Sequence, residues 1–106
     1  MAEKNQNTPL TEAVYYILLS VNSPLHGYGI IQKVKEMSGG RLVLAAGTLY
    51  GAITNLQSKG WIVTASEEEN SRKKEYIITA SGKEVLQAEL TRLEELVKNG
   101  QDVMRG

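Results

Sequence analysis

The residues best suited to a chemical role form a polar stretch near the middle of the chain, from Thr48 to Lys59. If this stretch is a helix, its apolar side chains share one face, and the opposite polar face has no acidic side chain. Such a face can approach nucleic-acid phosphates without charge repulsion. Asn55 could form two hydrogen bonds with an adenine edge, and the Thr48 hydroxyl could reach a phosphate. The same face is also typical of an ordinary solvated helix.

A basic triplet, Arg72-Lys73-Lys74, follows a predicted turn at Asn70-Ser71. Basic side chains at a hairpin tip can lie along a phosphate backbone and add affinity that does not depend on base sequence. Three acidic residues, Glu67 to Glu69, precede the turn and partly cancel this positive field. Taken alone, the triplet is more typical of a solubilising hairpin tip, so its meaning depends on the helix before it.

The sequence contains few residues that could form a catalytic site or bind a metal ion. The chain has no cysteine, which excludes a disulfide framework, a thiolate metal site and a thiol nucleophile. His26 is the only histidine, and no carboxylate lies close to it in sequence, so we expect it to form a hydrogen bond near a helix start. We therefore expect no enzyme activity, no catalytic residue, no metal and no cofactor.

The composition is that of a soluble globular domain of 106 residues, with 42% hydrophobic and 23% charged residues. Twelve basic and twelve acidic side chains cancel, which argues mildly against DNA binding. However, Leu25 to Gly60 contains several basic residues and the single acid Glu36, and local charge steers a polyanion more than net charge does. No apolar run is long enough to span a bilayer, and Met1 to Asn7 does not resemble a signal peptide. We expect a cytoplasmic location.

Three short helices should position the polar stretch. Thr8-Pro9 predicts a helix start with Thr8 as N-cap, and apolar residues at helical spacing extend the helix to Val21. A second helix is predicted from Tyr28 to Ser38, and a third from Gly47 to Lys59. Glycines follow both of these helices and indicate where they end.

Two strands and a fourth helix complete the pattern. Residues 61–65 and 76–79 are rich in aromatic and β-branched side chains, which predicts a β-hairpin. Ser81 and Glu84 fit a capping box for the fourth helix, and Thr79 is a competing N-cap. We expect this helix to end at about Asn99-Gly100, with a frayed tail after it.

The fourth helix carries an apolar seam whose members alternate spacings of four and three: Leu86, Leu90, Leu93 and Val97. This spacing is typical of coiled-coil pairing. The seam could also pack within the chain, but few other elements exist to cover it, so self-pairing buries it best. A symmetric dimer would present two copies of the third helix to a pseudo-palindromic DNA site.

The order of elements is that of a winged helix-turn-helix domain. Four segments at these separations are together specific: Leu25–Ile30 (LHGYGI), Gly47–Tyr50 (GTLY), Leu56–Ile62 (LQSKGWI) and Tyr76–Gly82 (YIITASG). Through them, from about Leu10 to Leu96, the chain resembles the PadR-like transcriptional regulators, in the compact subgroup with one C-terminal helix.

The resemblance implies a dimeric bacterial or phage repressor, of a kind often released from DNA by small aromatic or phenolic ligands. It also implies that the fourth helix makes most of the dimer contact, packing with the first. Tyr28, Thr48 and Tyr50 match motif positions linked to DNA contact or to support of the DNA-reading surface. Gly51 stands where family members commonly carry Pro. The fourth helix has no aromatic residue, which disfavours the tryptophan-lined drug site of some relatives.

We therefore predict a mainly α-helical winged helix-turn-helix DNA-binding domain with a β-hairpin wing over residues 1–80. A C-terminal dimerisation helix and tail, residues 81–106, should complete one compact unit. The expected partners are double-stranded DNA, a second copy of the chain and a small-molecule effector. The alternative function is a winged-helix protein-interaction module that does not bind DNA.

The residues expected to contact DNA are Tyr28, Thr48, Tyr50, Gly51, Thr54, Asn55, Ser58, Lys59, Arg72, Lys73 and Lys74. For Tyr28 and Tyr50, DNA contact and a purely structural role are equally open. The seam residues of the fourth helix are expected at the dimer interface. Tyr15 and Tyr16 are the candidates for lining an effector cavity, although packing is the commoner role for such side chains.

Overall fold

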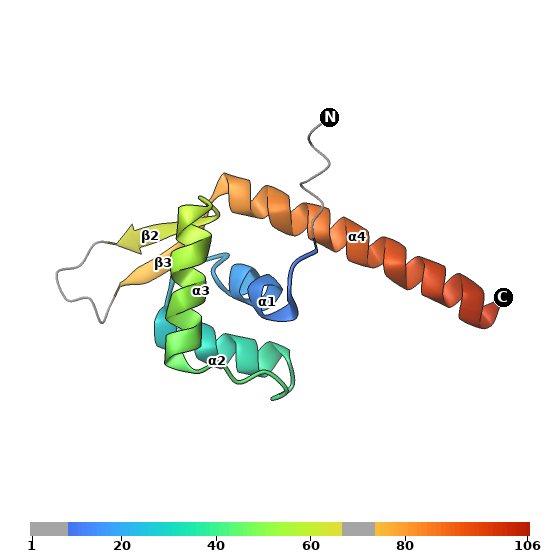
Figure 1. The fold of residues 1–106 in the computed structure, drawn as a ribbon, viewed down its shortest axis with the longest axis horizontal. Coiled ribbons are helices and arrows are strands. Elements are labelled where there is room, and N and C mark those ends of the chain that lie inside the picture. The colour runs from blue at the N-terminus through green and yellow to red at the C-terminus, as the bar shows by residue number, and fades with distance from the viewer. Residues whose placement is uncertain (1–8, 67–73) are drawn as a thin grey trace.

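The computed structural model describes residues 9–66 and 74–106. Its elements, in chain order, are α1 (Glu12–Ser20), β1 (Leu25–His26), α2 (Gly27–Met37), α3 (Ala46–Ser58), β2 (Ile62–Ser66), β3 (Glu75–Ile78) and α4 (Ala80–Arg105). The three short helices gather beside a small sheet, and α4 runs away from this body as a long rod (Figure 1). The predicted mainly helical, winged helix-turn-helix architecture is confirmed.

The core lies where α1, α2 and α3 meet the sheet. Its buried side chains are Ile17, Leu18, Val21, Ile30, Val34, Leu49, Ile53, Leu56, Ile62, Tyr76 and Ile78. Most come from the apolar helix faces predicted from sequence spacing, and burying each large aliphatic side chain contributes roughly 1.5–3 kcal/mol. Because the apolar face of α3 is held in this core, its polar face points outward.

The sheet has three antiparallel strands in the order β1-β3-β2. The predicted hairpin strands pair Ile62 with Ile78, and β1 adds a pairing of Leu25 with Tyr76. The sequence did not predict β1, because two residues are too short to show a strand periodicity. This short strand joins the start of α2 to the wing. The predicted turn at residues 70–71 lies outside the described residues.

The first two helices begin at side-chain caps. The α1 helix starts at Glu12 rather than Pro9, because the Thr11 hydroxyl accepts a hydrogen bond from the Val14 N–H at 3.1 Å. The predicted N-cap at Thr8 lies outside the described residues. At α2, Nδ1 of His26 accepts a hydrogen bond from the Gly29 N–H at 3.0 Å. This confirms the expectation that His26 bonds near a helix start.

The predicted capping box at Ser81 is wrong, and the competing N-cap at Thr79 is correct. The Thr79 hydroxyl accepts from the Gly82 N–H at 3.0 Å and donates to the Gly60 carbonyl at 2.7 Å. A Cβ on Gly82 would overlap the Trp61 carbonyl oxygen. These contacts tie the start of α4 to the turn after α3, which a capping motif read from sequence alone does not include.

The predicted end of α4 at Gly100 is also wrong, because the helix continues to Arg105. Gly100 does not adopt the positive φ that ends a helix, unlike Gly39, Gly40 and Gly60. Lys98 Nζ lies 2.9 Å from Asp102 Oδ2, one turn further along the helix. Twenty-six residues give α4 a length of about 39 Å.

Candidate nucleic-acid interface

The outer face of α3 is exposed along its length. Leu49, Ile53 and Leu56 are buried on the inner face. The predicted contact residues on the outer face are all exposed: Thr48, Gly51, Thr54, Asn55, Ser58 and Lys59. The structure thus places these side chains together on one accessible, acid-free surface, and their contact with DNA stays a prediction.

Two hydroxyl groups on this face donate hydrogen bonds to the backbone of their own helix. The Thr54 hydroxyl bonds the Tyr50 carbonyl at 3.0 Å, and the Ser58 hydroxyl bonds the Asn55 carbonyl at 3.0 Å. The protons of both hydroxyls are therefore directed at the helix, and their oxygen lone pairs remain available to an external donor.

The start of α3 has no side-chain cap, because its N-cap residue is Ala45. By contrast, side chains cap the starts of α1, α2 and α4. The first amides of a helix carry partial positive charge and have no intrahelical partner. The uncapped end of α3 therefore offers donors beside the polar face.

Tyr28 and Tyr50 flank this end of the surface in different ways. Tyr28 is 67% exposed, and its hydroxyl accepts a hydrogen bond from Gln32 Nε2 at 3.0 Å. Tyr50 is half-exposed, and its hydroxyl lies so close to Gly27 that a Cβ there would overlap it. Burial and the nearby Tyr50 raise the pKa of Tyr76 in the core below. Tyr50 therefore packs α3 onto α2 and keeps an exposed edge.

The wing can be placed only in part. Lys74 is half-buried just before β3. Arg72 and Lys73 lie outside the described residues. The predicted role of the basic triplet therefore stays a prediction.

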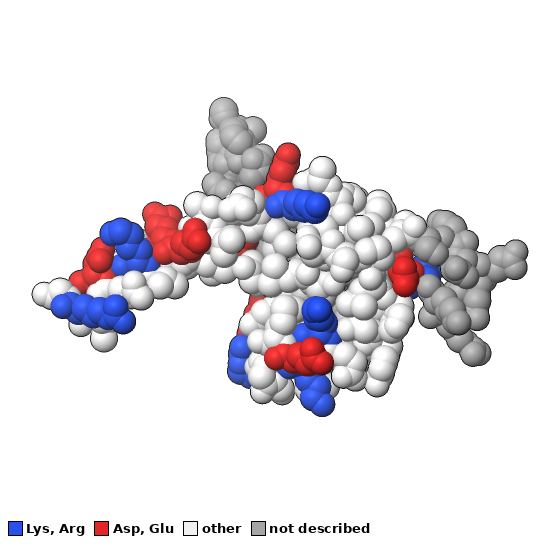
Figure 2. All heavy atoms as spheres, turned by 180° about the vertical axis from the view of Figure 1, so that it is seen from behind, with Lys and Arg blue, Asp and Glu red and all other residues white. Residues whose placement is uncertain are grey.

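Charge is mixed over the molecular surface. Both signs alternate along α4, and a mostly basic group lies around α2 (Figure 2). Arg41, after α2, pairs with Glu12 at the start of α1. The Arg41 hydrogen bond holds the pKa of Glu12 below its ordinary value.

The predicted seam of α4 divides into an inner and an outer part. Leu86 packs against the core of its own chain. Leu90 is 40% exposed and Val97 is 57% exposed, and both line a shallow groove with Leu93. Met104, which is 84% exposed, continues the same helical stripe one turn beyond Gly100. No described element covers this outer half of α4 (Figure 1).

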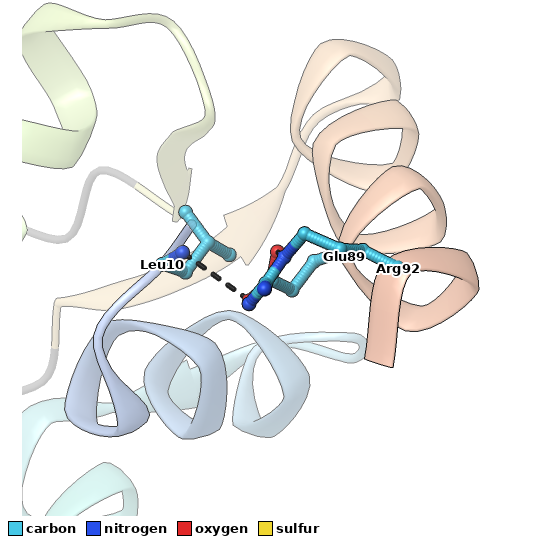
Figure 3. Close-up of polar contacts among 3 residues, drawn as sticks. All are labelled: Leu10, Glu89 and Arg92. Carbon is cyan, nitrogen blue, oxygen red and sulfur yellow. Dashed lines mark hydrogen bonds and ion pairs between the residues drawn. The ribbon is translucent and has the colours of Figure 1, made fainter. Parts of the chain in front are cut away.

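A buried ion pair that the sequence analysis missed joins α4 to the segment before α1. Glu89 is 5% exposed, and its carboxylate accepts from Arg92 Nη2 at 2.7 Å and from the Leu10 N–H at 3.2 Å (Figure 3). The bonds from Arg92 and Leu10 hold the pKa of Glu89 below its ordinary value, although burial acts in the opposite direction. The i, i+3 spacing of these charges is visible in the sequence, but their burial is not.

A groove of about 850 Å³ lies between the start of α1, the end of α3 and the first turns of α4. Its lining includes Val14, Asn55, Trp61 and Val85. Tyr15 and Tyr16, the candidates for an effector cavity, are not part of this lining. Their rings lie 6.1 Å apart on α1, and Tyr16 packs against the core.

Within residues 9–66 and 74–106, no cluster of His, Asp and Glu side chains could hold a metal ion. Over the same ranges, no helix is both long and apolar enough to cross a membrane.

Comparison with known protein families shows to which family this chain belongs. The model of the PadR-like family of transcriptional regulators matches residues 16–88, from within α1 to the third turn of α4. The chain belongs to the PadR-like family. The resemblance seen in the sequence motifs is thereby confirmed, and membership places the chain among transcriptional regulators rather than enzymes.

Solved PadR-like structures share the fold over most of the chain. A PadR-like transcription factor from Bacteroides fragilis is 27% identical with a TM-score of 0.68, covering 86% of this chain and 87% of that one. A PadR family transcription regulator from Clostridium difficile R20291 is 25% identical with a TM-score of 0.64, covering 90% and 98%. A transcriptional regulator from Clostridium thermocellum, 23% identical with a TM-score of 0.69 and covering 86% and 87%, shows the fold alone.

One curated relative shares sequence over a shorter span. It is an uncharacterized 37.1 kDa protein in transposon Tn4556 of Streptomyces fradiae, 37% identical over 68 residues. The alignment covers 64% of this chain but 19% of that protein, so the PadR-like chain spans only a small part of its length.

Proposed function

We propose that this PadR-like regulator binds double-stranded DNA by inserting α3 into the major groove. The observation that carries the proposal is the outer face of α3, which is exposed, polar and free of acidic side chains opposite a fully buried apolar face. A major groove admits a helix, and base edges there offer hydrogen-bond partners to Asn55 and its neighbours. Residues 1–80 then form the DNA-binding part.

Phosphate contacts would surround the inserted helix. The uncapped amides at the start of α3 and the hydroxyl of the exposed Tyr28 are suitable donors, and the half-exposed Tyr50 would lie beside the same phosphates. The basic triplet of the wing, residues 72–74, would lie along the backbone of the same duplex. These contacts fix orientation and affinity, and they carry no base-sequence information.

The protein would act as a homodimer through α4, residues 81–106. The outer part of the seam comprises Leu90, Leu93, Val97 and Gly100. Leu86, which packs against the core of its own chain, and Met104 continue the same spacing at its two ends. This spacing is symmetric about residue 95, so an antiparallel second copy would set Leu93 against Val97 and Leu90 against Gly100. The exposed apolar side chains would become buried, and the glycine would leave room for a leucine. A two-fold dimer favours a pseudo-palindromic operator.

We further propose that the dimer is a repressor, because a dimer that covers an operator blocks other proteins from the same DNA. Its proposed location is the cytoplasm. Release by a small ligand, with Tyr15 and Tyr16 near its site, remains part of this proposal. Its support is the family membership together with the two tyrosines on α1, the helix expected to pack with α4 of the partner.

The test is binding of the purified protein to a labelled duplex selected from a random library, measured by gel shift at increasing salt. Because neutralised phosphates release counterions, affinity should fall steeply with salt, with a log–log slope of about −0.9 per phosphate contacted. Replacing Arg72, Lys73 and Lys74 together by alanine should weaken specific and scrambled duplexes alike. Asn55→Ala should instead reduce the preference for the selected duplex.

The alternative function, a protein-interaction module, would show itself in the same experiment. Zero net charge is the observation that favours it. A protein that retains no duplex even at low salt would support the alternative and end the DNA-binding proposal.

A further inference from the structure

The long polar side chains of α3 and of its C-cap residue, Lys59, are mostly held against the protein body. Lys59 Nζ lies 5.0 Å from the centre of the Trp61 ring, in a cation–π contact. Gln57 Nε2 donates to the Thr64 hydroxyl of β2 at 3.4 Å. Tyr50 lies over Gly27 at the start of α2. None of these three side chains is therefore set to read a base edge beneath the centre of the helix.

What remains on the outer face is a small set of groups. Asn55 is exposed, and its carboxamide has no hydrogen-bond partner among the described residues. Thr54 and Ser58 have directed their hydroxyl protons at their own helix, which leaves oxygen acceptors and, on Thr54, a methyl group. Between Gly51 and Ser58 the outer face thus presents one amide, two acceptors and one methyl, and Thr48 lies further along, at the start of the helix.

These groups discriminate between base pairs. Guanine presents two acceptors, N7 and O6, in the major groove, and its usual partner is an Arg or Lys. The Thr54 and Ser58 hydroxyl groups already donate their protons to carbonyls of their own helix, so they cannot donate to acceptors of guanine, and Lys59 lies against Trp61. Adenine offers an acceptor and an amino donor that match a carboxamide, and thymine offers a methyl group for apolar contact.

We propose that α3 reads A·T base pairs: Asn55 bonds N7 and the N6 amino group of an adenine, and the Thr54 methyl contacts the C5 methyl of a thymine in a neighbouring pair. This specificity rests on the proposed function, since it requires α3 in the major groove. Thr54 and Asn55 are consecutive and lie about 100° apart on the outer face, which suits neighbouring base pairs.

The experiment uses the full chain and chemically altered duplexes. A random duplex library is enriched on the protein, and single positions of the selected half-site are then changed from thymine to uracil, which removes the C5 methyl, or from adenine to 7-deazaadenine, which removes N7. One uracil should weaken binding about fourfold, as for a lost methylene-sized contact. One 7-deazaadenine should weaken it about tenfold.

Variants assign each effect to its side chain. In Thr54→Ser, which keeps the hydroxyl and lacks the methyl, the critical uracil should have no further effect. Thr54→Val, which keeps a methyl, should retain the sensitivity to uracil. Asn55→Ala should become insensitive to 7-deazaadenine. Thr91→Ser makes the same small change on exposed α4 and should leave every binding ratio as in the parent chain.

The outcomes separate the specificity from the function. A selected half-site made only of G·C pairs, or a preferred duplex whose binding no altered base weakens, would overturn the A·T reading while leaving DNA binding in place. A library that yields no preferred duplex at all would overturn the proposed function and the specificity with it.

Discussion

At Gly51, a glycine occupies the middle of a helix although nothing in the described chain requires it. Its φ is not positive, and a Cβ added there would meet nothing within 4 Å. Glycine in a helix interior costs about 1 kcal/mol relative to alanine. The position lies on the outer face of α3, so we infer that the glycine serves the contact of that face with DNA.

We expect Gly51→Ala to have opposite effects on folding and on binding. The free energy of unfolding in urea should rise by about 1 kcal/mol, because alanine is the better helix former. DNA affinity, measured by fluorescence anisotropy, should fall, because the added methyl would stand between the helix backbone and the groove. Thr91→Ala on exposed α4 is the control, since it also favours a helix and should not alter affinity. A stabilised Gly51→Ala protein with parental affinity would contradict insertion of α3 at this point.

The Glu89 carboxylate is a second residue with a consequence that can be measured. Its folded-state pKa lies below the ordinary value of a glutamate, because Arg92 and the Leu10 N–H bond its charged form. A depressed carboxyl pKa contributes stability that is fully present above the ordinary value and is lost as the pH falls through the folded-state pKa. The contribution of Glu89 should therefore be constant near neutral pH and disappear in acid.

We expect Glu89→Gln to lower the free energy of unfolding by about 1–2 kcal/mol at pH 7, because a charge-assisted pair becomes a neutral one. The difference from the parent chain should shrink between about pH 5 and pH 3. Urea unfolding at several pH values measures it. Glu95→Gln, at an exposed glutamate of the same helix, should change little. If the free energy of unfolding of Glu89→Gln stayed below that of the parent chain by the same amount down to about pH 3, the carboxylate would not be stabilised by Arg92 and Leu10.

At the scale of elements, the start of α4 shows how two plausible caps are resolved. Thr79 and Ser81 both have the residue type of an N-cap, and the sequence left them as competitors. The position of the chain at the end of β3 selects Thr79 rather than Ser81 as the N-cap, because the Thr79 N–H bonds the Trp61 carbonyl at 2.9 Å. From that position its hydroxyl reaches both Gly82 and Gly60.

Alanine substitutions separate the two caps. Thr79→Ala should reduce the free energy of unfolding by about 1–2 kcal/mol, since it removes the cap and leaves a carbonyl with one partner fewer. Ser81→Ala, an exposed position inside the first turn, should change it by less than about 0.5 kcal/mol. Thermal or urea unfolding followed by circular dichroism gives both values. Equal losses in the two variants would argue against Thr79 as the cap.

Helix faces were predictable from sequence, whereas short or boundary features were not. Apolar spacing correctly identified the buried faces of α1, α2 and α3, because burial of one face per turn imposes a period of 3.6 residues. The two-residue β1 leaves no such signal. For α4, the prediction of an end at Gly100 gave the glycine more weight than Met104, which continues the apolar stripe. Glycine often ends a helix, but it does so through a positive φ, which Gly100 lacks.

At the scale of the whole molecule, the exposed apolar side chains of the outer half of α4 are the proposed interface of the homodimer. Leu93→Asp should produce monomers in light scattering, because a carboxylate would be buried in the proposed interface. A mass typical of the dimer in this variant would place the interface elsewhere.

The orientation of the two copies can be tested by disulfides, because the chain has no cysteine of its own. Antiparallel pairing about residue 95 sets Leu93 opposite Val97. An oxidised mixture of Leu93→Cys and Val97→Cys proteins, one of them tagged, should form a mixed disulfide that neither protein forms alone. A disulfide between two Leu93→Cys chains would instead indicate parallel helices.

The sequence by itself determined the class of fold, the family and the acid-free helix between Thr48 and Lys59. It could do so because helical periodicity and short glycine-containing motifs are local properties of the chain. Only the tertiary structure decided which polar groups remain available on that helix. Lys59 meets Trp61, Gln57 meets Thr64, and Glu89 meets Leu10 across the chain. Such pairings depend on how elements pack in space, and residue spacing along the chain carries no record of them.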